Sequence, residues 1–386
     1  MATNYRLDLP HDCPFSARRL TETIFLFREN DGYGQYPNIL AKICMSDSFD
    51  SRDPATTLAA GVIVLSDAGC ATNVKNPYYG TPGNSDMPEK WNLNTVLKYT
   101  INPGGQLPYL VITSHCHFDH ILGIGLLPPT DSNPKRGDVS ERQGPPTTVL
   151  SSAFDPDFIN PWDHLCMHSM AKTFKAVCPY YTIGVLAEDS QHILYNSPSV
   201  SRPISTGIIV LQTPGHTPDS LSWYDTASHL LSVGDSFYEV SSPDTRTSKW
   251  GADIRSPIIF ETHSDLALWW KSVDRVLQFV REQNGQLIRQ YTGAQQAPRV
   301  AIGAGHVTAL SPDAESFILS IRAFMSRILR DEVPTEKIDV DWLASLDLWG
   351  WDDGERAATI EYEWIVWSPK RIIEEGRQTI PRIEWS

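Results

Sequence analysis

Short apolar runs along this chain are separated by polar stretches rich in glycine and proline. Continuous apolar runs bounded by turn residues are typical of strands buried in a sheet. One of them, Y-L-V-I-T-S at 109–114, leads directly into a cluster of histidines. The pattern predicts strands over 21–28, 37–44, 59–69, 109–114, 147–151, 180–186, 207–213, 220–225, 229–234 and 299–305.

Two longer segments place apolar residues at helical spacing. In 264–282 the apolar positions are 266, 269, 270, 273, 276, 277 and 280, which would bury one face of a helix. The S-P-D-A-E signal predicts a helix over 311–330, and shorter helices are expected over 93–101 and 158–177. Strand runs are followed by helices twice, without a sequence repeat. This order predicts sheets covered by helices in one large α/β domain.

Three segments do not fit this pattern of strands and helices. The stretches 70–92 and 128–146 are too long and too rich in polar residues and proline to be plain connections. Six of the 12 tryptophans lie between Trp342 and the C-terminus. We therefore expect a main domain over 1–330 and a Trp-rich extension over 331–386, packed on the domain or on a partner subunit.

The charge of the chain excludes some classes of partner. Of its 386 residues 41% are hydrophobic, enough for a sizeable core, and the net charge is −14. This charge repels phosphate backbones, and no basic cluster offsets it, so no nucleic-acid partner is expected. No run reaches the ~18 apolar residues of a membrane span, and 1–16 lacks the apolar region of a secretory signal. These features predict a cytoplasmic protein without a membrane partner.

The cysteines add little chemistry. The six of them are scattered and form no C-x-x-C pair, which argues against a cysteine zinc site and against a disulfide framework. We expect free thiols in the core at 13, 44, 70, 116, 166 and 178.

The segment 114–120 reads S-H-C-H-F-D-H, and it carries the strongest chemical signal of the chain. Alternation along an extended backbone places His115 and His117 on the same side, so both imidazoles can converge on one point. Asp119 and His120 follow where the strand turns, and they can address a second point nearby. Imidazole and carboxylate suit zinc, and also iron or manganese.

Three further residues stand in glycine-rich turns where predicted strands end. His216 lies in T-P-G-H-T-P, Asp235 in S-V-G-D-S and His306 in G-A-G-H-V. Glycine lets the backbone turn sharply and lets a ligand approach closely. Each histidine alone is more typical of a structural role, but together with 115–120 they complete the ligands of a two-metal site.

The order H-x-H-x-D-H, T-P-G-H-T, G-D and G-H resembles the glyoxalase-like and lactonase-like branch of the metallo-β-lactamase superfamily, roughly over 20–330. The resemblance implies an αββα sandwich, with two mixed β-sheets flanked by helices and the metals at one edge. It implies one metal bound by His115, His117 and His216, a second bound by Asp119, His120 and His306, and Asp235 bridging both. Asp67, in L-S-D-A-G, is implied as the partner of a ligand histidine, although Ala68 stands where the family usually has threonine.

Two zinc ions at such a site would convert a bridging water to hydroxide near neutral pH, with Asp119 orienting it and carrying its proton to the leaving group. True β-lactamases of this family often have Cys or Ser at the position of Asp235. The carboxylate there favours esterase, thioesterase and lactonase chemistry instead. Tyr238 stands three residues later, where it would hydrogen-bond the substrate or pack under a loop.

Other aromatic residues and histidines are weaker candidates. Tyr78, Tyr79, Trp91 and Trp162 are candidate substrate contacts, although ordinary loop positions are an equal alternative. His164 and His168 have i, i+4 spacing on a predicted helix, but no carboxylate completes a site there, so we expect a structural role.

The sequence therefore predicts a dinuclear zinc hydrolase that cleaves a lactone, lactam, ester or thioester in a small, cyclic or aromatic molecule, in detoxification or secondary metabolism. Within the same fold, a mononuclear iron enzyme similar to persulfide dioxygenases is the alternative. A nuclease is disfavoured by the acidic charge. The tail from 331 either caps the sandwich or forms a homodimer interface.

Overall fold

The computed structural model describes residues 5–46, 61–71, 91–129, 145–196, 202–246, 254–291, 297–340, 343–349 and 363–385. The chain divides into two compact units, 1–210 and 211–386. Tyr78, Tyr79 and most of the two long predicted loops lie outside the described residues. No helix in the described part of the chain is long and apolar enough to cross a membrane.

The first unit is built on an eight-stranded sheet whose strands follow one another in chain order. Neighbouring strands from β1 to β5 are antiparallel, and those from β5 to β8 are parallel, so the sheet is mixed. Its strands are β1 (Tyr5–Leu7), β2 (Phe15–Arg19), β3 (Ile24–Glu29), β4 (Asn38–Met45), β5 (Gly61–Ser66), β6 (Tyr109–Ile112), β7 (Thr147–Ser152) and β8 (Ile183–Ala187).

The centre of this sheet is buried on both faces, as its continuous apolar runs predict. Every residue of β3, β5 and β6 is buried. Helix α2 (Leu93–Thr100) begins at Asn92, whose side chain accepts from Thr95 N while the Thr95 hydroxyl accepts from Asn92 N. This reciprocal cap satisfies two backbone donors at the helix start. Leu93, Val96 and Leu97 then pack in one core cluster with apolar residues of the central strands.

After β6 the chain turns into the short helix α3 (Phe118–Ile121) and the 3₁₀ helix η2 (Leu122–Leu126). The predicted helix over 158–177 is wrong. The structure has two short helices, α4 (Pro156–Ile159) and α5 (Trp162–His168), with Asn160 extended between them. Pro161 explains the break, because proline disfavours the helical conformation in the residue before it. The first unit closes with β9 (His192–Tyr195), which pairs antiparallel with β10 (Ile204–Gln212).

The structure corrects the expectation of six free thiols. Cys166 and Cys178 form a disulfide across twelve positions of sequence, while the other four cysteines are free and buried. The absence of a C-x-x-C pattern did not exclude this bond, because the chain between α5 and β8 turns back on itself.

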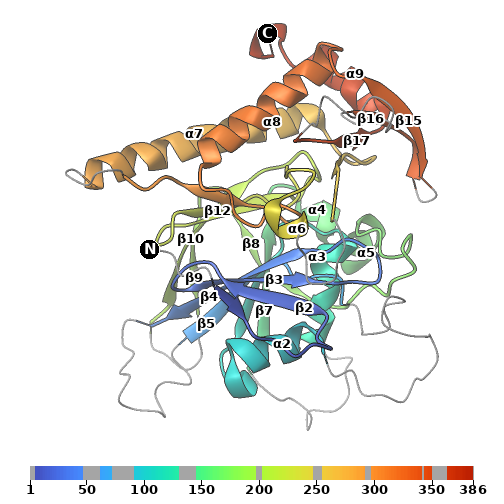
Figure 1. Cartoon of the computed structure of the whole chain (residues 1–386). Helices are drawn as coiled ribbons and strands as arrows, with labels where there is room; N and C mark the ends of the chain where they lie inside the picture. The colour runs from blue at the N-terminus through green and yellow to red at the C-terminus, as the bar shows by residue number, and fades with distance from the viewer. Residues whose placement is uncertain are drawn as a thin grey trace. The chain divides into compact units, whose positions relative to one another are not determined.

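The second unit contains β11 (Leu221–Asp225) and β12 (Leu230–Ser232), which are antiparallel, and β14 (Ala301–Gly303), which runs parallel to β12. The helices α7 (Leu266–Gln290) and α8 (Ala314–Leu329) lie side by side in this unit (Figure 1). Both begin with an aspartate cap, Asp265 and Asp313 respectively, that accepts a backbone N–H. Strands and helices thus form mixed sheets with helices, the class that the sequence predicts.

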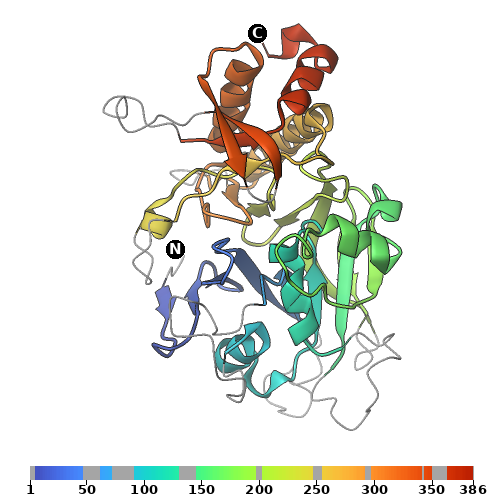
Figure 2. The ribbon, with the colours of Figure 1, turned by 90° about the vertical axis from the view of Figure 1, so that its right-hand side faces the viewer.

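The C-terminal segment is part of the second unit. Its strands β17 (Val366–Ser368), β16 (Leu343–Trp349) and β15 (Thr335–Val340) form a sheet with β13 (Ile258–Ile259), and α9 (Lys370–Thr379) follows (Figure 2). Trp364 and Trp385 of this segment are buried in the unit. The Trp364 ring meets Phe317 edge to face at 4.9 Å, and its Nε1 donates to Ser320 Oγ.

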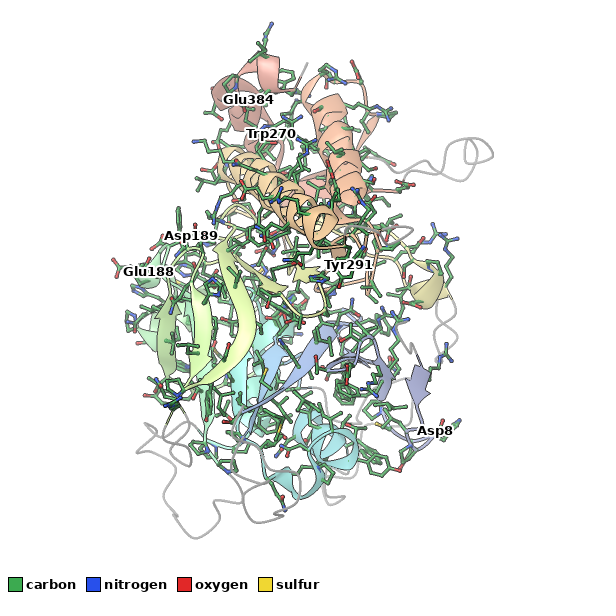
Figure 3. All side chains as sticks on the ribbon, turned by 90° about the vertical axis from the view of Figure 1, so that its left-hand side faces the viewer. Asp8, Glu188, Asp189, Trp270, Tyr291 and Glu384 are labelled. Carbon is green, nitrogen blue, oxygen red and sulfur yellow. A yellow bond between two sulfur atoms is a disulfide. The ribbon has the colours of Figure 1, made fainter. Side chains whose placement is uncertain are left out.

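Arg322 contacts the C-terminal residues of this unit. The Arg322 guanidinium carbon lies over the ring of Trp270, 4.6 Å from its centroid, and Arg322 Nη2 donates to Glu384 O. Trp270 and Glu384 are labelled in Figure 3. Trp385 is itself buried and donates its Nε1 to Ile380 O. Trp364 and Trp385 therefore contribute to packing within the second unit.

Candidate metal site

The first candidate ligands follow β6, where the buried strand ends. The rings of His115 and His117 are buried, and His115 Nε2 lies 2.9 Å from His117 Nδ1. His115 Nδ1 lies 3.0 Å from Ser114 Oγ. Because the Ser114 hydroxyl donates its proton to Asp67, it accepts from His115 Nδ1–H, which leaves a lone pair on His115 Nε2. This is the tautomer that a metal ligand needs.

The next two candidates stand on α3. Asp119 and His120 are both buried, and His120 Nε2 lies 3.7 Å from Asp119 Oδ2. The backbone positions of this turn are set by hydrogen bonds, because Phe118 N donates to Ser169 O and Ala68 N donates to His120 O. The H-x-H-x-D-H spacing thus delivers two imidazoles from an extended segment and a carboxylate and an imidazole from a helical turn.

Asp67 holds this segment from the end of β5. Its carboxylate accepts from Ser114 N at 2.6 Å, from Ser114 Oγ at 2.8 Å and from His120 Nδ1 at 2.9 Å. The last contact leaves His120 Nε2 to face a ligand. Asp67 has φ +64°, an unusual value for a residue other than glycine, and it is 1% exposed. The turn also needs Gly123, where a Cβ atom would lie 1.9 Å from Ala68 O.

Sequence reasoning missed two acidic residues that lie behind this turn. Glu29 accepts from Cys70 N, and Asp31 accepts from three backbone N–H groups of the following loop. Burial raises the pKa of Asp31, against the hydrogen bonds that lower it, and the charge of Asp119 raises it further. Burial also raises the pKa of Cys70 well above its usual value, with Asp31 and Glu29 adding to the effect, so this thiol stays protonated.

In the second unit His216 is held by α7 and β13. At Gly215, with φ +147°, a Cβ atom would lie 2.3 Å from the backbone Cα of Trp269, so only glycine allows this close approach. His216 Nδ1 donates to Ile259 O at 2.8 Å, and Ser264 Oγ donates to His216 O. The first contact leaves His216 Nε2 to act as a ligand.

Asp235 and His306 follow the neighbouring parallel strands β12 and β14. Gly305 N donates to Gly234 O at 2.8 Å, which joins the two turns, and Gly234 has φ +52°. His306 Nε2 lies 3.2 Å from Asp235 Oδ2, and both side chains are buried. Two parallel strands therefore deliver a carboxylate and an imidazole to one point.

These pairs of side chains have the chemistry and spacing that a divalent metal requires. Adjacent ligands on a four-coordinate zinc lie about 3.3 Å apart, given metal–ligand bonds of about 2.0–2.1 Å. The ligand atoms of the three pairs are separated by 2.9 Å, 3.7 Å and 3.2 Å. Buried His and Asp side chains that could serve as metal ligands thus occur in both units.

Tyr238 lies beside one of these residues but uses its hydroxyl elsewhere. Its ring centroid is 5.4 Å from that of His306, and its hydroxyl donates to Pro257 O at 2.6 Å. The side chain is 3% exposed. A hydrogen bond from Tyr238 to a substrate would have to replace the bond to Pro257.

The weaker candidates have structural contacts. Trp91 is buried and meets Tyr99 edge to face, while Trp162 Nε1 donates to Pro179 O. His164 Nδ1 contacts Asp157 O at 2.8 Å. His168 stacks on Phe158, with the ring centroids 3.9 Å apart. All four side chains are therefore engaged in contacts within the first unit.

Part of the chain matches a known protein family. Residues 103–282 match the family model described as the metallo-beta-lactamase superfamily. Among curated proteins, the putative transcription factor avaE of Aspergillus versicolor is 22% identical over 330 residues, which cover 83% of this chain and 78% of that protein.

Solved structures of this superfamily are also similar to the chain. A beta-lactamase domain protein from Burkholderia ambifaria is 14% identical and aligns with a TM-score of 0.45 over 84% of this chain and 76% of that one. A metallo-beta-lactamase family protein from Thermus thermophilus is 14% identical, with a TM-score of 0.45 over 80% and 81% of the two chains.

Proposed function

We propose that this chain, a member of the metallo-β-lactamase superfamily with the fold of that family, is a dinuclear zinc hydrolase that cleaves a carbonyl bond in a small molecule. The bond belongs to a lactone, lactam, ester or thioester. In this proposal, which follows the order of the sequence motifs, the ligands of one metal are His115, His117 and His216, and those of the other are Asp119, His120, Asp235 and His306.

The observation that carries the proposal is the hydrogen-bond network of Asp67. The same buried carboxylate holds His120 directly and His115 through the Ser114 hydroxyl, so each imidazole carries its proton on Nδ1 and presents Nε2 as its basic nitrogen. Such partners raise the basicity of a ligand and fix its orientation. A purely structural histidine cluster has no need for two imidazoles in this tautomer.

The chemistry that bound metal ions supply is the activation of water and the polarisation of a carbonyl group. The remaining steps belong to side chains of this chain. Asp119 is buried, so its carboxylate can orient the attacking water, accept its proton on one oxygen and return that proton to the leaving atom. Burial of the surrounding histidines excludes bulk water, which strengthens each of these interactions.

The substrate is proposed to be a small molecule rather than a nucleic acid. The name of the avaE protein points to transcription, but the net charge of −14 of this chain opposes contact with a phosphate backbone. Binding to a random-sequence DNA duplex at physiological salt would count against the small-molecule proposal.

The test is a hydrolysis screen of the zinc-loaded full chain against lactones, lactams, aryl esters and acyl thioesters. His117→Ala is the blank, and His192→Ala, which removes an exposed histidine outside both ligand groups, is the matched control. We expect hydrolysis in one class that His117→Ala abolishes and His192→Ala retains. Metal analysis that finds one iron per chain and no zinc, or no hydrolysis in any class, would refute the proposal.

A further inference from the structure

The disulfide between Cys166 and Cys178 closes a loop that no part of the proposed chemistry uses. Cys166 stands in α5, and Cys178 lies shortly before β8. Within the loop, Ala176 N donates to Ala171 O and Phe174 N donates to Met170 O, so the segment folds on itself. The loop is thus a compact element whose two ends are joined covalently.

This loop holds the backbone in the middle of the predicted ligand segment. Phe118 lies between His117 and Asp119, and its N–H donates to Ser169 O at 2.8 Å. Ser169 is in turn tied to the disulfide end of the loop, because its hydroxyl donates to Cys166 O at 3.0 Å. The segment that follows α5 therefore lies beside α3, as Figures 1 and 2 show.

Side-chain packing joins the same two segments. The Phe118 ring stacks on Phe174, with centroids 4.2 Å apart and planes at 22°, and Tyr33 meets both rings edge to face. Phe118 is buried in a small cluster whose other members include Ala171 and Cys178. Movement of the loop would therefore displace Phe118 together with the two ligand residues that flank it.

We propose that the Cys166–Cys178 disulfide positions the metal-ligand segment 115–120, and that its reduction makes the protein lose metal faster. This inference rests on the proposed metal site but not on the identity of the substrate. A cellular dithiol would break the S–S bond by exchange, giving its two protons and two electrons to the cysteines and becoming a disulfide itself. Cys166, Cys178 and Phe174 are then positioning residues, since none of them is a ligand.

The first measurement is the redox state of the purified full chain. Alkylation of the denatured, unreduced protein should label the four free cysteines, and alkylation after reduction should label all six. Peptide mapping should find the disulfide between Cys166 and Cys178. Labelling of six cysteines without reduction would overturn the proposal.

The second measurement is the rate at which the zinc-loaded protein loses zinc to a chromogenic chelator. Reduction uses a phosphine, which takes an oxygen from water while each sulfur takes a proton. We expect the reduced protein and the Cys166→Ser/Cys178→Ser variant to release zinc about tenfold faster, the size of effect typical of residues that orient metal ligands. The matched control is Cys44→Ser, which replaces a buried thiol on β4 and should keep the rate of the parent protein.

Two further variants separate positioning from general stability. Leu97→Ala removes a fully buried side chain of α2 in the same unit, so it should lower the unfolding midpoint without a comparable increase in zinc release. Phe174→Leu removes the stacking on Phe118, so it should speed zinc release in the oxidised protein and add little once the disulfide is reduced. Additive effects of Phe174→Leu and reduction would overturn the proposal.

The outcomes distinguish this inference from the proposed hydrolase. A protein that hydrolyses no substrate but releases zinc faster after reduction would refute the hydrolase and support the positioning role. A hydrolase that releases zinc equally fast in both redox states would refute only the positioning role. An oxidised chain that retains no zinc would refute both.

Discussion

Replacing Asp67 with asparagine tests the hydrogen-bond network that orients two of the predicted ligands. The parent carboxylate accepts from Ser114 N, from Ser114 Oγ and from His120 Nδ1. An asparagine of the same shape has one oxygen and one NH₂ group. If its oxygen keeps the bond to Ser114 N, its NH₂ group faces His120, which must then move its proton from Nδ1 to Nε2.

That change removes the lone pair with which His120 would bind a metal. Loss of an orienting partner typically costs a metal site 10–100-fold in affinity. This factor corresponds to about 1.4–2.7 kcal/mol, since a tenfold change is about 1.36 kcal/mol. A hydrogen bond to a charged group contributes about 1.5–3 kcal/mol, so losing the single bond to His120 accounts for an effect of this size.

The assay is zinc competition with a chromogenic chelator, with urea unfolding of the same samples as a stability reference. Asp225→Asn is the matched control, because Asp225 is also a buried carboxylate and accepts from Ala227 N, Ser228 N and Ser228 Oγ. We expect both variants to lose stability and Asp67→Asn alone to lose zinc affinity. Equal zinc affinity in Asp67→Asn and the parent protein would refute the tautomer reasoning.

Three smaller changes test other parts of the structure. Gly215→Ala places a Cβ atom against the backbone of Trp269, so urea denaturation should give a loss above about 3 kcal/mol or an unfolded protein, and a variant of parental stability would contradict this packing. Tyr238→Phe loses one buried hydrogen bond, and we expect about 1 kcal/mol lower stability with zinc content unchanged; a turnover equal to that of the parent would remove the phenol from the mechanism. Hydrogen bonds, of which the one from Arg281 has the largest effect, lower the pKa of Glu315 in the folded protein. The ionised carboxylate therefore stabilises the fold fully above its ordinary pKa of about 4.5, and this stabilisation is lost as the pH falls through the lower pKa of the folded state. Glu315→Gln should therefore be less stable than the parent at pH 7, and the difference should shrink as the pH falls below 4.5; a difference that does not shrink in acid would argue against the ion pair.

The sequence predicted the elements whose signal is local. The run at 109–114 and the strong helical spacing of 264–282 correspond to β6 and α7, because burial of an apolar face is encoded within each segment. The predicted helix over 158–177 failed where a local signal was overlooked, since Pro161 stands inside it. The strands β15 to β17 were also missed. The partner of β17 is β13, far away in the sequence, whereas β15 and β16 form a local antiparallel pair that the sequence analysis overlooked.

Some features of the candidate site were also predictable from local sequence, and others were not. The residue types of S-H-C-H-F-D-H already indicated metal ligands, and the alternation around Cys116 already implied that two imidazoles share a side. Which nitrogen of each ring carries the proton depends on contacts from distant segments. Asp67 lies 53 positions before His120, and Ile259 lies 43 positions after His216. No local sequence pattern shows that residues so far apart in the chain are in contact.

The sequence by itself therefore determined the available chemistry: imidazoles and carboxylates at metal-ligand spacing in an acidic chain, part of which matches the model of the metallo-beta-lactamase superfamily. Only the tertiary structure decided which hydrogen bonds orient those ligands, and that Cys166 pairs with Cys178 rather than staying free. The physical reason is that side-chain chemistry and local spacing are properties of a short segment. Tautomers, close backbone approaches and disulfides depend instead on atoms that folding brings together from remote parts of the chain.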